Sequence, residues 1–99
     1  MKTIVEPLSF EWDHGNINKS LDKHGVTTHL AEEPFTDPHL LTLPDRSHSQ
    51  NELRFHLLGS THAGQILFIT YCIRQNKIRI ISARPADKKE RKIYANKKT

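Results

Sequence analysis

Basic side chains with nearby acid–base groups are the residues of this sequence that could do chemistry. Cleaving RNA by attack of its own 2′-OH needs a base for that proton, cationic charge on the pentavalent phosphorane and an acid for the departing 5′-oxygen. Arg54 and His56 would share one face of a strand, and Arg79 lies on a later strand. Glu52 flanks Arg54 and could either accept the proton or orient the arginine. We expect His56 to contact the RNA.

Lys23 and His24 end an expected helix and add a further cation and an imidazole. If this pair converges with Arg54, Arg79 and Glu52, the five side chains supply all three roles without a metal ion. The sequence leaves that convergence open, because a single basic residue is more often a solvated surface group. The expected catalytic residues are therefore Arg79, Arg54, Lys23, His24 and Glu52.

The histidines do not have the spacing of a metal site. Seven are present, and the pair nearest to ligand spacing, His24 and His29, is five residues apart with Gly25 between them. Zinc-binding His-Glu-x-x-His and Cys-x-x-Cys motifs are absent, as is the Gly-x-Ser-x-Gly motif of serine hydrolases. Cys72 lies inside an apolar run, which is typical of a buried thiol. We therefore expect neither a metal nor a cofactor.

Residues 77–94 combine a short apolar strand with a highly charged helix. Ile78 and Ile80 alternate with basic residues, which indicates a strand with one apolar face. Pro85 suits the first turn of a helix, and Asp87 would then lie in its positive N-terminal turn. A strand that displays arginine and leads into a basic helix indicates a phosphate-binding surface.

Arg79 and Arg84 are five residues apart, so in an unbroken strand their side chains would project from opposite faces. They can share a site only if a bulge, or the end of the strand near Ser82, turns Arg84 to the other side. We expect Arg84 to position phosphate and Trp12 either to stack on a base or to belong to the core. Nonspecific contacts to the RNA backbone are expected from Lys88, Lys89, Arg91 and Lys92.

The charge of the chain is unevenly distributed over its 99 residues. Residues 1–73 contain five Lys and Arg against nine Asp and Glu, a balance of −4, and residues 74–99 contain ten against two, a balance of +8. This asymmetry indicates a polyanion-binding end and a separate acidic region. The mean hydropathy is −0.64, and no apolar run approaches the roughly 20 residues that span a bilayer. We expect one domain, residues 1–99 with frayed final residues, in a reducing cytoplasm without membrane contact.

The expected elements define an α+β fold with a small antiparallel sheet, N-terminal helices and a C-terminal helix. Asp13 is expected to cap a helix over residues 14–24, which Gly25 ends, and Thr27 or Thr28 to cap a second helix that ends near Glu33. Polar residues 45–51 are expected to form a mobile loop. Strands are expected at residues 8–12, 40–43, 53–57, 66–73 and 78–83.

Several blocks in this order resemble the BrnT family of toxins, over the range from Phe10 to Tyr94. The blocks are Phe10-Glu-Trp-Asp13, Asn18, Lys23-His-Gly-Val26, Phe35 with Asp37, Glu52-x-Arg54-Phe55 and Arg79-Ile-Ile-Ser-Ala-Arg84-x-Ala86-x-x-x-Glu90-Arg91-x-x-Tyr94. The sequence departs from the family pattern at Gly15, where better helix formers are usual, and at Leu53, where a second charge is common.

The resemblance implies a bacterial cytoplasmic ribonuclease toxin of a type II toxin–antitoxin system, with a RelE-like fold, that inhibits translation. It further implies an antitoxin, BrnA, whose ribbon-helix-helix domain binds operator DNA, so that the toxin reaches DNA only through its partner. An inactive toxin that serves as a corepressor is the alternative. The family's functional positions correspond here to Lys23, His24, Glu52, Arg54, Arg79 and Arg84.

Overall fold

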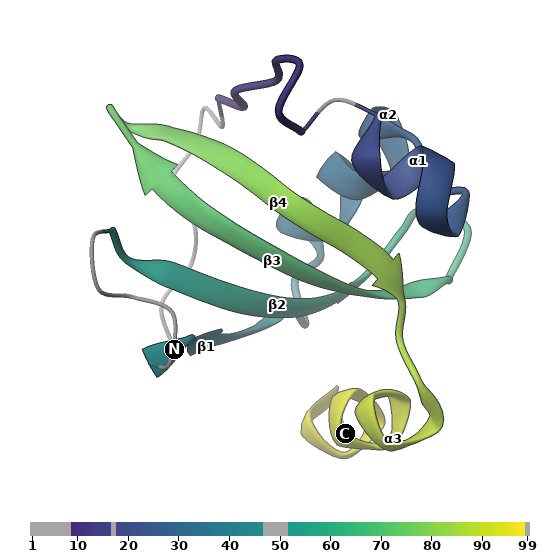
Figure 1. The fold of residues 1–99 in the computed structure, drawn as a ribbon. Helices are drawn as coiled ribbons and strands as arrows, with labels where there is room; N and C mark the ends of the chain where they lie inside the picture. Colours follow the sequence, from purple (N-terminus) through teal and green to yellow (C-terminus); the bar gives the residue numbers. More distant parts are fainter. Residues whose placement is uncertain (1–8, 17, 47–51, 99) are drawn as a thin grey trace.

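A computed structural model describes residues 9–16, 18–46 and 52–98. The elements follow in the order α1 (Lys19–His24), α2 (Thr28–Glu32), the 3-10 helix η1 (Glu33–Thr36), β1 (Leu41–Pro44), β2 (Arg54–Ser60), β3 (Ile66–Arg74), β4 (Lys77–Pro85) and α3 (Lys88–Lys98). Within these ranges the strands form one antiparallel sheet in the order β1-β2-β3-β4 (Figure 1). This confirms the α+β class. The described helices are all too short and too polar to cross a membrane.

One face of the sheet packs against the helical segments that precede it. Leu57, Leu67, Ile69 and Ile80 point to this face and are at most 2% exposed, because successive side chains of a strand point to opposite sides. They form one cluster with Val26, Ala31, Phe35 and Leu40. Figure 1 shows α2 behind the sheet and α1 beside β4. The sheet therefore turns its other face toward the viewer.

That second face carries mostly polar side chains. Residues paired directly across antiparallel strands share a face, so the pairing of Cys72 with both Arg54 and Arg79 places the two arginines on one side. The strand alternation brings further polar residues to the same side. We call this side the polar face and define it by Arg54, His56, Thr70, Cys72, Arg79, Ser82 and Arg84.

A β-bulge in β4 explains how two arginines five residues apart share this face. Tyr71 pairs with Ile80, whereas the preceding residue of β3 pairs with Ser82, so Ile81 is an extra residue of β4. The extra residue changes the alternation once, and Arg84 returns to the side of Arg79. The spacing of the two arginines required a bulge or the end of the strand to bring Arg84 to the side of Arg79, and the structure has the bulge.

The chain before α1 differs from the prediction. Asp13 does not cap a helix over residues 14–24, because residues 14–16 form a turn and α1 begins only at Lys19. The carboxylate of Asp13 accepts a hydrogen bond from the Gly15 amide instead, which favours a turn over a helix. Of the strand expected at residues 8–12, the described part forms only one parallel bridge, between Phe10 and Ile78. Gly25, with a φ of +72°, ends α1 as predicted.

The predictions for the middle of the chain are confirmed where the structure describes it. Thr27 caps α2 by accepting a hydrogen bond from the Leu30 amide at 3.1 Å, and the four strands from β1 to β4 lie at the expected places. The expected loop at residues 45–51 lies largely outside the described residues, which omit 47–51.

The C-terminal helix begins later than predicted. Pro85 ends β4 rather than starting a helix, because the Ala86 amide still bonds to the carbonyl of Ile66 across the sheet at 2.9 Å. Asp87 is therefore the cap of α3 and not part of its first turn. Its carboxylate accepts the Glu90 amide at 2.8 Å, and the Glu90 carboxylate accepts the Asp87 amide at 2.9 Å. This reciprocal pair is a capping box.

A partly buried group of hydrogen bonds around Asp37 attaches α3 to the rest of the fold. The hydroxyl of Tyr94, a residue only 4% exposed, donates to the Asp37 carboxylate at 2.6 Å. Asp37 also accepts the backbone amides of Ser60 and His39 at 2.8 and 2.9 Å. Burial alone would raise the pKa of Asp37, but these three hydrogen bonds outweigh it and lower that pKa.

Tyr94→Phe is expected to lower the free energy of unfolding by about 1–2 kcal/mol at neutral pH, because the partly buried carboxylate of Asp37 loses a donor. A lowered pKa stabilises the fold above the unfolded-state value near pH 4, and that stability is lost as the pH falls through the folded-state pKa. The difference between Tyr94→Phe and the unmodified protein should therefore shrink from pH 7 to pH 3 in urea unfolding.

Tyr71→Phe is the matched control for this measurement. Burial raises the pKa of Tyr71 to about 12, and among the described residues no hydrogen-bond partner is found for its hydroxyl. Loss of that hydroxyl should change stability by less than about 0.5 kcal/mol. An equal loss in the Tyr71 and Tyr94 variants would contradict the role of the hydrogen bond to Asp37.

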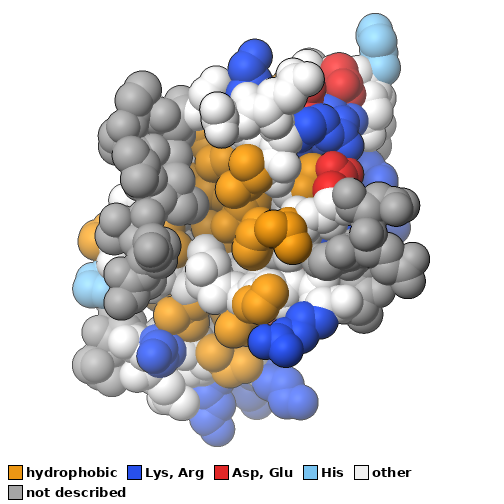
Figure 2. All heavy atoms as spheres, turned by 90° about the vertical axis from the view of Figure 1, so that its left-hand side faces the viewer, with side chains coloured by type: hydrophobic (Ala, Val, Ile, Leu, Met, Phe, Trp, Pro, Cys, Tyr) orange, Lys and Arg blue, Asp and Glu red, His pale blue; other side chains and the backbone are white. Residues whose placement is uncertain are grey.

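Three large apolar side chains are exposed in β1, just before β2 and in β3. Leu43 is 63% exposed, Leu53 67% and Ile73 52%. Figure 2 shows one side of the molecule, with hydrophobic side chains gathered near its centre and Lys and Arg above and below them. Leu43 pairs with His56 of the polar face, whereas Ile73 pairs with Ile78 of the core, so these two exposed side chains lie on opposite faces of the sheet.

Candidate functional site

Three of the five expected catalytic residues line one pocket of the polar face. Arg54, Arg79 and Glu52 border a cavity of about 160 Å³. The pocket lies where the starts of β2 and β4 meet the end of β3, next to the turn at residues 14–16. Two further cations that the sequence analysis did not single out, Lys19 and Arg74, also line it. The pocket therefore concentrates positive charge at one end of the sheet.

Arg79 is held by a carboxylate from the turn before α1. Its Nη1 donates to Asp13 Oδ2 at 2.8 Å and its Nη2 to Asp13 Oδ1 at 2.9 Å. A second carboxylate, that of Glu11, has an oxygen 3.5 Å from Nη1. The hydrogen bond with Arg79 is the main reason that the pKa of Asp13 is lowered, and it likewise raises the pKa of Arg79. Both groups are charged throughout the physiological pH range.

Glu52 binds Arg74, another arginine at this end of the sheet. Its carboxylate accepts two hydrogen bonds from Arg74 Nη2, at 2.9 and 3.1 Å, and one from Nε at 3.3 Å. The bonds with Arg74 lower the pKa of Glu52, and the charge of Arg54 adds to the effect. Glu52 is thus an ionised carboxylate placed between two arginines, which suits it to orient cations and makes it a weak base.

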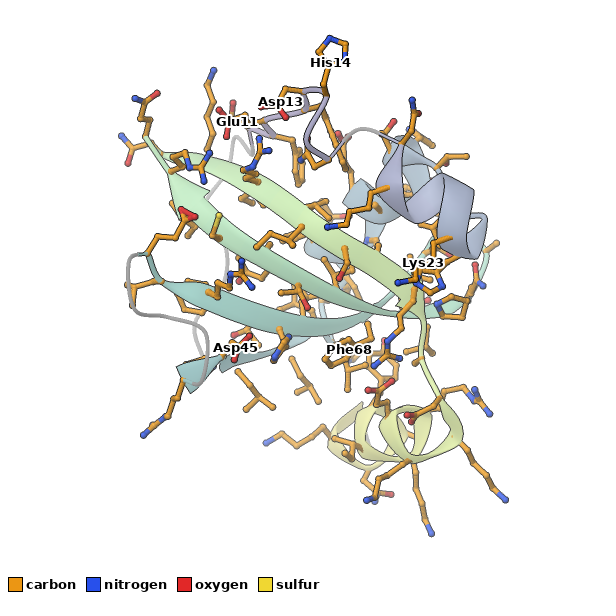
Figure 3. All side chains as sticks on the ribbon, in the orientation of Figure 1. Glu11, Asp13, His14, Lys23, Asp45 and Phe68 are labelled. Atoms are coloured by element: carbon orange, nitrogen blue, oxygen red, sulfur yellow. The ribbon has the colours of Figure 1, made fainter. Side chains whose placement is uncertain are left out.

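His56 lies in the middle of the polar face with both ring nitrogens engaged. Its Nδ1 is 3.0 Å from Thr70 Oγ1, and its Nε2 is 3.3 Å from Asp45 Oδ2. The buried carboxylate of Asp45 favours the proton on Nε2, so in the neutral ring Nδ1 accepts from the Thr70 hydroxyl. Asp45 lies at the end of β1 (Figure 3). The pair fixes the orientation of the imidazole.

Arg84 occupies the opposite end of the polar face from the pocket. Its two terminal nitrogens donate to the two oxygens of Glu90, both at 2.8 Å, and its guanidinium lies over the Phe68 ring, 4.4 Å from the centroid. The hydrogen bond with Arg84 lowers the pKa of Glu90. Arg84 therefore joins β4 to the first turn of α3.

The structure does not bring Lys23 and His24 into the pocket. Both side chains are exposed at the end of α1, and neither lines the cavity. Figure 3 shows Lys23 beside the end of β4, well away from Asp13, the partner of Arg79. The five expected catalytic residues thus form two separate groups, three in the pocket and two near the far end of β4.

The expected RNA-contacting residues differ in how they are used by the fold. Trp12 packs against the core, and its indole nitrogen donates to Glu32 at 2.7 Å. Lys88 and Lys89 are exposed on α3, as is Arg91, which also donates to the Ala86 carbonyl at 2.7 Å. These exposed cations extend the basic surface beyond the sheet.

Several residues that build the pocket were missed in the sequence. The sequence predicts that Asp13 caps a helix, that Glu11 lies in a strand and that Asn16 lies inside a helix. Asn16 is in fact 4% exposed, and its amide donates to the carbonyls of Glu11 and Ile80. The one available signal was the four-residue run 13–16, whose Asp, Gly and Asn are turn-forming residues.

Groups of three or more His, Cys, Asp or Glu side chains that could hold a metal ion do not occur among the described residues. Cys72 is 1% exposed, and burial raises the pKa of its thiol. The described residues of the pocket and the polar face instead provide guanidinium groups and the ammonium group of Lys19, and several of these cations are paired with carboxylates. Guanidinium and ammonium groups are the side chains that bind phosphate.

A cation-lined pocket on a small α+β sheet is suited to bind the phosphates of nucleic acids or of other ligands. Residues 12–90 match a family model described as "Ribonuclease toxin, BrnT, of type II toxin-antitoxin system". The chain therefore belongs to the BrnT family of ribonuclease toxins, whose substrate is RNA and whose partner is an antitoxin. A search of curated proteins gave no match. The family match confirms the resemblance of the sequence blocks.

Proposed function

We propose that this BrnT-family toxin is a metal-independent endoribonuclease that cleaves RNA through attack of the 2′-OH and thereby inhibits translation. The observation that carries the proposal is the meeting of Arg54, Arg79 and Glu52 in one pocket. These residues come from β2, β4 and the segment before β2, so only the folded sheet assembles them. Cationic side chains can supply the charge that other nucleases take from a metal.

The proposed chemistry assigns the phosphorane to the arginines. Arg54 and Arg79 stabilise the negative charge that develops when the 2′-oxygen bonds to phosphorus and the bond to the 5′-oxygen breaks. Glu52 accepts the 2′-OH proton or, as its bonds to Arg74 equally support, orients the guanidiniums. The 5′-oxygen takes its proton from a cationic acid at the site.

The remaining expected residues are proposed to hold the RNA on either side of the cleaved phosphate. Lys23 and His24 lie near the end of β4 where Arg84 stands, so a strand that crosses the polar face from the pocket would reach them. Lys88, Lys89 and Arg91 would hold the RNA backbone without selecting sequence, with His56 and Trp12 as further candidate contacts.

The finer features of the system are also proposals. We infer a RelE-like arrangement of a single toxin domain over residues 1–99 that acts in the bacterial cytoplasm. The antitoxin is inferred to be of the BrnA type, with a ribbon-helix-helix domain that carries the complex to operator DNA. Leu43, which pairs with His56, is a 63% exposed apolar residue on the polar face. An antitoxin that covers Leu43 together with the basic residues of this face would inhibit the toxin directly.

Cleavage by the isolated protein should persist in excess EDTA, because the proposed charge stabilisation comes from side chains. The test is to incubate the purified chain with RNA with and without EDTA and to map both product ends. We expect 2′,3′-cyclic phosphate and 5′-hydroxyl ends at similar rates in both samples. Cleavage that stops in EDTA and returns with Mg²⁺ would overturn the metal-independent mechanism.

A second candidate function is a catalytically inactive toxin that works as a corepressor with its antitoxin. The observation that favours it is the pairing of Arg79, Arg74 and Arg84 with carboxylates. Protein that protects RNA but does not shorten it, even at high concentration and without antitoxin, would select this alternative.

A further inference from the structure

The carboxylate of Asp13 sits in a group of hydrogen-bond donors that fits any oxyanion. Oδ1 accepts from Arg79 Nη2 at 2.9 Å and from the Gly15 amide at 2.8 Å, and Oδ2 accepts from Arg79 Nη1 at 2.8 Å. Two parallel N–H groups of a guanidinium together with one backbone amide match two oxygens of a phosphodiester as well as those of a carboxylate.

Gly15 allows this amide to approach the guanidinium. A Cβ on residue 15 would lie 2.7 Å from Arg79 Nη2 and 3.2 Å from Asp13 Oδ1. A side chain there would displace the guanidinium from the amide. The departure of the sequence from better helix formers at this position thus has a structural reason, because the glycine leaves space for the Arg79 guanidinium beside the turn.

We propose that the Arg79 guanidinium and the Gly15 amide form a binding site for one RNA phosphate, which the Asp13 carboxylate occupies until RNA displaces it. This rests on the proposed function of the pocket and adds to it a resting state. In that state the carboxylate satisfies the guanidinium, and the RNA phosphate takes over the same three donors when it binds.

The surroundings of Asp13 permit the exchange. Its side chain is 51% exposed, whereas that of Arg79 is 14% exposed, so the carboxylate can leave while the guanidinium stays. Glu11 Oε1 lies 3.5 Å from Arg79 Nη1 and 4.0 Å from Arg74 Nη1. That oxygen is buried and has no hydrogen-bond partner among the described residues. Glu11 can therefore hold both arginines after Asp13 has left.

The neighbouring cations favour RNA as the ligand. Lys19, Arg54 and Arg74 line the same pocket, with Arg74 paired to Glu52, so a phosphate that replaces Asp13 on Arg79 lies close to further cations. A polyanion gains binding free energy from several adjacent cations, whereas a single carboxylate of a partner protein needs only the two parallel N–H groups of Arg79.

Asp13→Asn tests the proposal with a ligand that the protein cannot cleave. The amide keeps the size of the side chain and an oxygen for the Gly15 amide, but it removes the competing charge. Binding of a 2′-O-methyl RNA, followed by fluorescence anisotropy, should tighten up to about fivefold at low salt. The slope of log affinity against log salt should change by less than about 0.7, the value for one phosphate contact to a single strand, because the RNA contacts Arg79 in both proteins.

Two comparisons separate a local effect from the gain of one net charge. Asp87→Asn makes the same charge change at the start of α3, where asparagine still caps a helix, and it should leave the affinity within about a factor of two. In an Arg79→Ala background, Asp13→Asn should have no effect on binding. Equal tightening by Asp13→Asn and Asp87→Asn, or tightening that survives the loss of Arg79, would overturn the proposal.

The amide resonance of Gly15 gives a second readout that does not depend on RNA. Addition of inorganic phosphate should shift this resonance saturably in Asp13→Asn and much less in the unmodified protein; an unmoved resonance in the variant contradicts the site. Failure here is distinguishable from failure of the proposed function. Lost cleavage in Arg79→Ala with an unmoved Gly15 resonance rejects only the phosphate site, and tighter binding without any RNA cleavage rejects only the nuclease.

Discussion

Arg79→Ala is expected to lower the rate of RNA cleavage by about 10²–10³-fold, the usual cost of removing one preorganised donor to a developing oxyanion. The guanidinium lies in the pocket with Arg54 and is held in place by two carboxylates. Its loss removes charge from the phosphorane and leaves Asp13 and Glu11 as uncompensated negative charges. The measurement is single-turnover cleavage of an end-labelled RNA, accompanied by growth arrest on expression.

Two variants test whether this effect is specific to the pocket. Arg79→Lys keeps the charge but not the two-pronged geometry, and it should recover part of the lost rate. His24→Ala removes an imidazole that lies outside the pocket and should lower the rate by less than about threefold. If His24→Ala is as damaging as Arg79→Ala, the cleaved phosphate lies near the end of β4 and our assignment of the pocket is wrong.

Asn16→Ala is expected to lower the free energy of unfolding by about 2–3 kcal/mol, the largest effect on stability that we predict for a polar side chain. The Asn16 amide donates to the carbonyl of Glu11 at 3.0 Å and to that of Ile80 at 2.9 Å, and its oxygen accepts the Asp13 amide at 2.8 Å. Ile80 is the residue next to the bulge of β4, so truncation leaves a buried carbonyl without its partner.

Asn18→Ala is the matched control, because Asn18 is exposed in the same connection before α1. It should change stability by less than about 0.5 kcal/mol in urea unfolding. Asn16→Asp should be at least as damaging as Asn16→Ala, since a carboxylate cannot donate to either carbonyl. A fully stable Asn16→Ala protein would show that the turn at residues 14–16 does not depend on this amide.

The sheet could be predicted from the sequence because its signals are local. Alternation of Leu57 and Phe55 with polar residues, and the continuous apolar run 66–73, identify strands without reference to the rest of the chain. The start of α1 could not be predicted in this way. Asp13 has the same local preference for a helix cap and for a turn, and the choice depends on Arg79, which is 66 residues away in sequence.

The same distinction between local signals and distant contacts applies to the candidate site. Arg54 and Arg79 were identified because basic residues on strands are visible in the sequence, and their shared face follows once the strands pair. The carboxylate partners of Arg79, Asp13 and Glu11, were missed, since pairing between distant segments leaves no periodic signal. The bulge at Ile81 was foreseen only as a condition for Arg84, because alternation counts residues and cannot show where a strand gains one.

The bulge of β4 has a consequence for how the length of this chain can vary over evolutionary time. Because Ile81 has no partner across the sheet, loss of one residue at this position would leave every other pairing of β3 with β4 unchanged, and Arg79 and Arg84 would stay on their present side. A deletion inside the regular part of the ladder would instead move all following side chains to the opposite face. Relatives that are one residue shorter between the two arginines would therefore keep the same arrangement of charges, and alignments should allow their gap at this position.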